Sequence, residues 1–89
     1  MSEQNVESPE AHKPVIVEVN GKPVQLPKHR VTGLEIKQAA IDAGVEIKLD
    51  FELTEEAHGD KPARNVTDDE HITVTKNSEF LAVDPEEDS

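Results

Sequence analysis

The sequence predicts an α+β domain in which four or five strands form a mixed sheet and one helix covers one face of it. Three observations support this class. An alternating run of apolar residues is followed by Asn20-Gly21 and a second alternating run, which is typical of a β-hairpin. Residues 32–44 carry the start and stop signals of one helix. Residues 45–53 alternate again, as in a strand with one buried face.

The composition limits the classes of function. The 89 residues allow one domain with a single hydrophobic core. The chain has no cysteine, which excludes disulfides and thiolate chemistry. Its net charge of −11 argues against nucleic acid and anionic membranes as direct partners, because phosphate binding needs a basic face. No apolar run has the length of a membrane span or the form of a secretory signal, so we expect a cytoplasmic protein.

More than half of the excess negative charge lies at the two ends of the sequence. Residues 1–13 hold three acids and one base, and residues 84–89 hold four acids and no base. We expect residues 1–13 to form a disordered or partner-binding tail and residues 84–89 to form an acidic disordered tail. The domain itself is predicted to span residues 14–83. Acidic tails of this kind most often serve solubility.

Residues 14–27 are predicted to form the first hairpin. In the segment VIVEV, which begins at residue 15, valines alternate with Ile16 and Glu18. Asn20-Gly21 suits a two-residue turn, because both central positions need a positive φ. Pro23 has no N–H, which places the returning strand at an edge of the sheet. Because an unpaired edge can accept a strand from another chain, this edge is a candidate docking site.

Residues 33–43 are predicted to form the helix. Thr32 and Glu35 have the spacing of a capping box, in which each side chain bonds the other residue's free N–H. Gly44 suits the left-handed position that ends a helix, and Gly33 is expected to allow close packing or first-turn geometry. The apolar residues expected to face the sheet share one side of the helix: Ile36, Ala39, Ala40 and Ala43.

The rest of the sequence is predicted to complete the sheet. The odd-numbered side chains of VEIKLDFEL, residues 45–53, are expected to enter the core from one strand. Residues 55–64 indicate an exposed loop, followed by a short strand at Val66 and a second capping-box pattern in TDDE, residues 67–70. Residues 79–83 form the last strand. The resulting order, ββαβ(β)β, is that of the β-grasp fold.

Catalytic and metal-binding sites are not expected. Adjacent carboxylates occur, as at Glu55-Glu56, but an acid–base pair needs a pocket that shifts one pKa, and two phenylalanines leave little to build its walls. The four histidines lack the spacing of metal ligands. We therefore predict that the protein is not an enzyme and that it uses no cofactor and no metal.

Apolar residues outside the predicted core form the candidate interaction surface. Leu34 and Ile41 lie seven positions apart on the predicted helix, away from its alanine side. Ile16, Leu81 and Val83 fall on the outer face of the sheet if Phe80 points inward. We expect these five residues to mediate self-association, giving a homo-oligomer, or to bind a partner protein. Isolated apolar residues are also normal on monomers, so that alternative stays open.

The segment VTGLEIK, residues 31–37, together with the element order, resembles the bacterial ubiquitin-like domains of the multiubiquitin family. The N-terminal hairpin, the alternating segment after the helix, and an acidic DDE followed by a lysine-containing turn and Phe80 are further shared features. The resemblance covers roughly residues 14–83. It implies a modifier in a bacterial ubiquitination-like pathway, with a proposed role in defence against phage. The partners it implies are activating and conjugating enzymes and a metallopeptidase.

The sequence departs from this resemblance at its C-terminal end. Conjugated ubiquitin-like proteins end, or are processed to end, in Gly-Gly, whereas no glycine follows Gly59 here. Val83, Asp84 and Pro85 are therefore the candidate processing region, where a peptidase would trim the acidic tail. The alternative is a noncovalent β-grasp adaptor or interaction module that is never conjugated. A sulfur carrier is disfavoured, because it also needs a C-terminal glycine.

Overall fold

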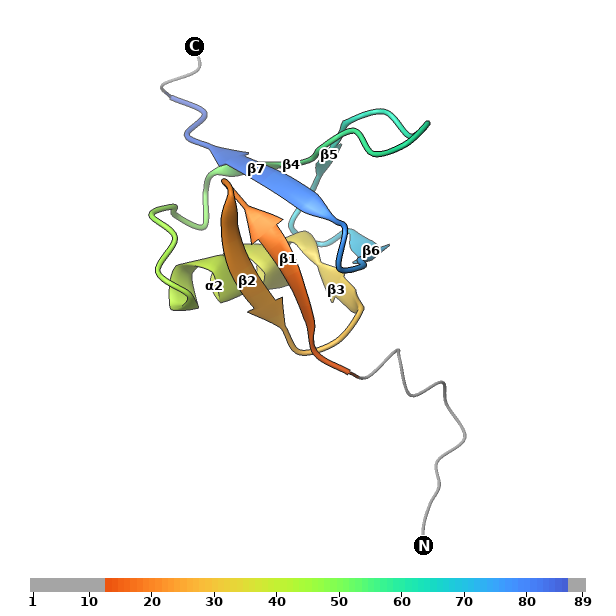
Figure 1. Cartoon of the computed structure of the whole chain (residues 1–89). Helices are drawn as coiled ribbons and strands as arrows, with labels where there is room; N and C mark the ends of the chain where they lie inside the picture. The colour runs from red at the N-terminus through yellow and green to blue at the C-terminus, as the bar shows by residue number, and fades with distance from the viewer. Residues whose placement is uncertain (1–12, 87–89) are drawn as a thin grey trace, which may run out of the picture.

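The computed structural model describes residues 13–86. Within this part of the chain a five-stranded mixed sheet has the order β2-β1-β7-β4-β5, and one α-helix, α2, lies across one face of it (Figure 1). The elements are β1 (Val15–Val19), β2 (Lys22–Leu26), β3 (Arg30–Thr32), α2 (Gly33–Asp42), β4 (Glu52–Glu55), β5 (Arg64–Val66), β6 (His71–Thr73) and β7 (Glu79–Val83). This architecture confirms the predicted α+β, β-grasp fold.

The first hairpin forms as predicted. Strands β1 and β2 pair antiparallel, and Asn20 and Gly21 between them have φ values of 55° and 79°. Both angles lie in the left-handed region that a two-residue hairpin turn requires. Alternate residues of β1 are buried and exposed, so one face of the strand lies in the core and the other in solvent.

Strand β7 occupies the centre of the sheet. It runs parallel to β1 and antiparallel to β4, so the C-terminal strand joins the two halves of the fold. Phe80 on β7 is fully buried, as predicted, and packs within the core. The core collects side chains from every element: Val15, Val17, Val19, Val24, Leu26, Val31, Ile36, Ala40, Val45, Ile47, Leu53, Val66, Ile72, Val74, Phe80 and Ala82.

Helix α2 begins with the predicted capping box. The Thr32 N–H donates to Glu35 Oε1 at 2.8 Å, and the Glu35 N–H donates to Thr32 Oγ1 at 3.2 Å. Gly44, with φ 94°, follows the last turn. The buried side of the helix differs from the prediction: Ala43 is exposed, whereas Lys37 is 3% exposed. At 100° per residue, this moves the centre of the buried side away from Ala43 and toward Lys37.

The prediction of one strand over residues 45–53 was wrong. Residues 45–51 are irregular, with a turn at residues 49–50, and β4 begins only at Glu52. Val45, Ile47 and Leu53 are buried as expected, but Leu49 is 42% exposed and Phe51 is half-buried. The alternation therefore marks which side chains face inward over most of the segment, but no partner strand pairs with its first seven residues.

Two further segments pair in ways that the sequence did not predict. Strand β3, directly before the helix, pairs antiparallel with β6 and forms a second, two-stranded sheet. Residues 56–63 extend β4 and β5 into a projecting arm (Figure 1), in which His58 and Lys61 form a bridge around Gly59. The TDDE segment makes a turn, with the Glu70 N–H donating to the Thr67 carbonyl at 3.2 Å, and its capping-box pattern is followed by β6 and not by a helix.

Candidate functional site

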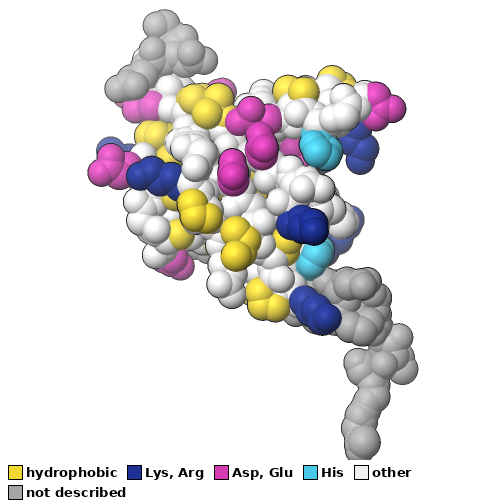
Figure 2. All heavy atoms as spheres, in the orientation of Figure 1, with side chains coloured by type: hydrophobic (Ala, Val, Ile, Leu, Met, Phe, Trp, Pro, Cys, Tyr) yellow, Lys and Arg dark blue, Asp and Glu magenta, His cyan; other side chains and the backbone are white. Residues whose placement is uncertain are grey.

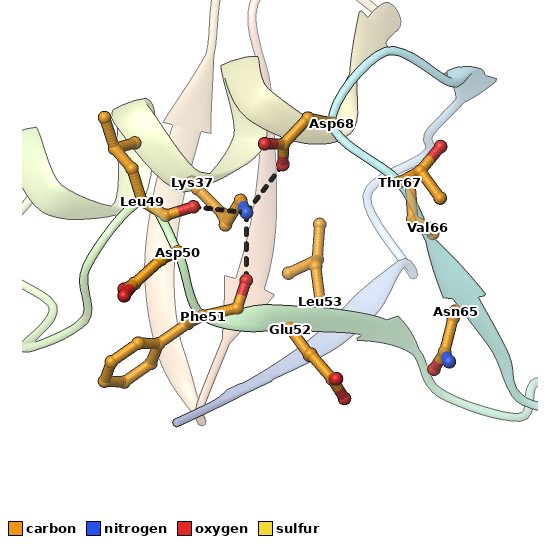
Figure 3. A pocket seen from close by; sticks show the side chains of 10 residues that line it. All are labelled: Lys37, Leu49, Asp50, Phe51, Glu52, Leu53, Asn65, Val66, Thr67 and Asp68. Atoms are coloured by element: carbon orange, nitrogen blue, oxygen red, sulfur yellow. Dashed lines mark hydrogen bonds and ion pairs between the residues drawn. The ribbon is translucent and has the colours of Figure 1, made fainter. Parts of the chain in front are cut away.

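A buried lysine connects the helix to two loops. The ammonium of Lys37 donates to the carbonyls of Leu49 at 2.6 Å and Phe51 at 2.9 Å, and it pairs with Asp68 Oδ1 at 2.6 Å (Figure 3). An ammonium has three donors, and here each has an acceptor. The side chain of Asp68 is 55% exposed, so the positive charge is inside while its counter-charge faces solvent.

The same carbonyls explain why residues 45–51 are not a strand. Backbone groups removed from water need hydrogen-bond partners, and in this segment the Lys37 side chain supplies two of them. Sequence reasoning missed this role because a lysine within a helix normally faces solvent. The available signal was its position: Lys37 lies one residue after Ile36 and three before Ala40, on the side of the helix that those residues bury.

The start of the helix rests directly on the loop that carries Asp68. The Gly33 N–H donates to the Glu70 carbonyl at 3.2 Å, and the Leu34 N–H donates to the Asp68 carbonyl at 3.1 Å. A Cβ on Gly33 would lie 2.3 Å from the Thr67 carbonyl oxygen. Gly33 therefore permits the close approach that the sequence analysis expected, and this approach brings Asp68 within reach of Lys37.

The five residues of the candidate interaction surface lie in three separate places. Ile16 is 55% exposed and Leu81 43% exposed on the outer face of the sheet, where Val83 is half-buried beside Leu81. The adjacent acidic residues Glu18 and Glu79 lie between Ile16 and Leu81 in the β1–β7 register. Figure 2 views the molecule in the orientation of Figure 1 and shows hydrophobic side chains separated by carboxylates, with no continuous apolar area on this view of the described residues.

The two helical residues of that surface flank Lys37. Ile41 is 38% exposed, whereas Leu34 is half-buried, more than the expected outward position implies. The shift of the buried side toward Lys37 accounts for this, since Leu34 and Ile41 lie about 60° and 40° from Lys37 around the helix. Leu34 is also held by its N–H bond to the Asp68 carbonyl.

The free edge of β2 is a poor acceptor for another strand, contrary to the docking edge considered from the sequence. The two-residue turn makes Val19 and Lys22 a hydrogen-bonded pair, so the backbone groups of residues 23, 25 and 27 point away from β1. Residues 23 and 27 are prolines and have no N–H. Gln25 is thus the one outward donor of this stretch, and prolines on an edge discourage strand addition.

The end of the last strand is held by the first turn. Asn20 Nδ2 donates to the Ala82 carbonyl at 3.1 Å, and the Ala82 N–H donates to Asn20 Oδ1 at 2.8 Å. The side-chain amide thus continues the β1–β7 ladder beyond the point where the backbone turns away. The candidate processing region follows this contact immediately, and its three residues, Val83, Asp84 and Pro85, are half-buried. The predicted acidic tail, residues 84–89, falls partly outside the described residues, because residues 87–89 are not described. Residues 1–12 of the predicted N-terminal tail also lie outside the described residues.

One ion-pair group stabilises the TDDE turn. Arg64 Nη1 donates to Glu70 Oε2 at 2.6 Å, and Arg64 Nε lies 3.3 Å from Glu55 Oε1. The hydrogen bond from Arg64, with that from the Thr67 N–H, lowers the pKa of Glu70, and the Glu70 bond raises the pKa of Arg64. In residues 13–86, no group of three or more metal-ligating side chains is positioned to hold an ion.

Comparison with family models relates these features to known proteins. The model of the multiubiquitin family matches residues 15–85, from the start of β1 to just beyond β7. The chain belongs to the multiubiquitin family. Comparison with curated proteins and with solved structures gave no match. The family match supports a ubiquitin-like domain.

Proposed function

We propose that this multiubiquitin domain acts as a protein modifier, or as an oligomer-forming component, in a ubiquitination-like pathway of the bacterial type that is directed against phage. The family match over residues 15–85 carries this proposal. In this role the chain catalyses nothing itself and is recognised in the cytoplasm by activating and conjugating enzymes and a peptidase. No helix within residues 13–86 is long and apolar enough to cross a membrane.

The end of β7 supports a modifier role. The Asn20 amide holds Ala82, Val83 pairs with Glu52 on β4, and the chain leaves the sheet after Val83. Asp84 and Pro85 lie beyond β7, so a peptidase could remove the residues after Val83 without unpairing a strand of the sheet. Trimming at Val83, Asp84 or Pro85 would leave every core residue in place.

The test is an assay with the full chain, ATP, and the activating enzyme and peptidase from the same source. The modifier role predicts loss of the residues after Val83 and a covalent adduct, both measured by intact-mass spectrometry. As a control, a Leu53→Asp variant places a charge in the core, so its unfolded chain should be cut without forming the adduct. A chain whose mass stays unchanged throughout would instead favour the noncovalent adaptor.

A further inference from the structure

A set of partly exposed apolar side chains lies on the helix and on residues 49–51, two segments that Lys37 connects. It consists of Leu34, Ile41, Leu49 and Phe51, which we call the helix–loop patch. Ile41 is 38% and Leu49 42% exposed, and the other two are half-buried. Leu34 and Ile41 lie on the helix face beside Lys37, while the carbonyls of Leu49 and Phe51 accept bonds from its ammonium (Figure 3). The buried Lys37 side chain thus holds residues 49–51 against the helix.

Of the two paired charges at the centre of the helix–loop patch, that of Lys37 is inaccessible, whereas the Asp68 carboxylate is 55% exposed. The Lys37 ammonium is buried and has three acceptors, so it offers nothing to a partner. Beside Leu49 and Phe51 lies a hollow of about 360 Å³, whose lining includes the core residues Leu53 and Val66 (Figure 3). Its lining also includes the acids Asp50, Glu52 and Asp68, so the hollow offers an apolar side chain from a partner space beside negative charge.

The border of the patch is acidic. The charged residues next to its members in the chain are Glu35, Asp42, Lys48, Asp50 and Glu52, all exposed. Four are acids and one is a base. The side-chain carboxylates of Asp42, Asp50 and Glu52 have no hydrogen-bond or ion-pair partner among residues 13–86, so their charges are available. Two copies placed patch to patch would oppose these acidic borders, which disfavours self-docking here, whereas a basic border on a partner would be attracted.

We propose that the helix–loop patch docks a partner protein that presents an apolar side chain flanked by lysine or arginine. The apolar side chain would enter the hollow beside Leu49, and the basic groups would face Asp50 and Glu52. This surface lies on the helix side, separate from Ile16, Leu81 and Val83 on the outer sheet face. The proposal does not depend on whether the chain is conjugated.

The direct test titrates the isotope-labelled full chain with synthetic nine-residue peptides and follows backbone amide shifts by NMR. The probe has a central leucine flanked by arginines. One control replaces the arginines with glutamates, and the other replaces the leucine with alanine. We expect saturable shifts in residues 34–53 and 66–68 with the probe, none with the glutamate peptide, and about fivefold weaker binding for the alanine peptide. Shifts centred on β1 and β7, or no shifts at all, would overturn the proposal.

Matched variants locate the effect on the protein. Leu49→Ser should raise the Kd for the probe about fivefold, while Ile16→Ser, at a more exposed residue of the opposite face, should leave it unchanged. If Leu49→Ser affects folding, the double variant Asp50→Asn and Glu52→Gln replaces it. This variant should weaken binding and reduce its salt dependence, because two exposed charges are removed.

Two further outcomes count against the proposal. If Leu49→Ser and Ile16→Ser raise the Kd for the probe equally, the peptide does not bind specifically at the helix–loop patch. Shifts in the patch that grow with protein concentration, without peptide, would assign it to a second copy of the chain. The peptide titration contains neither ATP nor an enzyme. A negative result would therefore overturn this proposal without affecting the modifier role, which the assay with ATP and enzymes tests.

Discussion

Strand β1 and residues 45–51 share the same alternation of apolar and polar residues, but only β1 lies in a sheet. All of β1 pairs with β2, and its last two residues, Glu18 and Val19, also pair with β7. Residues 45–51 have no strand beside them, and the ammonium of Lys37 bonds two carbonyls at their C-terminal end. Alternation therefore indicates which side chains point inward over most of each segment, with Leu49 an exception, and the available partners decide the backbone conformation.

Each region is also held by one polar side chain. Asn20 continues the ladder between β1 and β7 where the backbone turns away. Lys37 fastens the irregular segment to the helix and, through Asp68, to the loop after β5. The two contacts differ in their setting. The Asn20 amide adds hydrogen bonds to the end of an existing pair of strands, whereas the Lys37 ammonium bonds carbonyls that have no neighbouring strand within residues 13–86.

The largest expected effect comes from moving the helix away from the loop that carries Asp68. Gly33→Ala should lower the free energy of unfolding by at least about 3 kcal/mol, because the new Cβ would lie 2.3 Å from the Thr67 carbonyl oxygen. Gly44→Ala is the control: nothing lies within 4 Å of its Cβ, and its positive φ alone should cost about 1 kcal/mol. Urea denaturation measures both. If both variants lose the same free energy of unfolding, the lack of space for a Cβ at position 33 is not what destabilises Gly33→Ala.

Removing the ammonium should release residues 45–51 and leave β1 in place. We expect Lys37→Met to lower the free energy of unfolding by about 2–3 kcal/mol, since two carbonyls lose their donor and Asp68 loses its partner. Asp68→Asn should cost about 1 kcal/mol or less, because that side chain is half in solvent. Amide exchange should accelerate in residues 45–51 of Lys37→Met. Unchanged exchange there would mean that the segment is held by its apolar side chains alone.

The reciprocal experiment weakens the other region. Asn20→Gly keeps the positive φ of the turn but removes both side-chain bonds to Ala82, so the free energy of unfolding should fall by about 1–2 kcal/mol. Hydrogen exchange of the Ala82 amide should accelerate, whereas that of Leu81, which lies opposite Thr54 in the β4–β7 register, should keep its protection. Equal acceleration at both amides would show a general loosening of β7 instead.

The smallest effect concerns the turn that presents Asp68. Arg64 and the Thr67 N–H lower the pKa of Glu70 in the folded state, so its contribution to stability is complete above the pKa of an unfolded glutamate, about 4.3. That contribution is lost as the pH falls from there through the lower folded pKa. Denaturation of the wild type and Glu70→Gln at several pH values measures it: the difference should shrink in acid. A difference that stays constant with pH would exclude the Arg64 contact as its source.

The sequence predicted the local elements well where the signal and its partner are close together in the chain. The Asn20-Gly21 turn and the Thr32–Glu35 capping box each depend on residues within four positions, and both formed as expected. β3 and β6 were missed because their pairing joins residues about 40 positions apart, and three-residue strands carry little periodicity. Residues 45–53 were assigned to one strand because alternation was taken to imply pairing.

The candidate site was predictable only in part. Ile16, Ile41 and Leu81 are exposed as the pattern indicated, but the sequence could not show that they lie in three places. Lys37 was missed because its role depends on carbonyls 12 and 14 residues away and on a carboxylate from another loop. Interaction with other proteins, oligomer formation and trimming at Val83 remain predictions.

The burial of Lys37 makes its amine chemically distinct from the six others in the chain. Lys13, Lys22, Lys28, Lys48, Lys61 and Lys76 are all exposed. An acylating reagent, or an enzyme that attaches groups to amines, therefore meets six open targets in the folded domain and reaches the seventh only when the helix separates from residues 49–51. The rate at which Lys37 is labelled would then report how often this part of the molecule opens, from a single peptide in a digest.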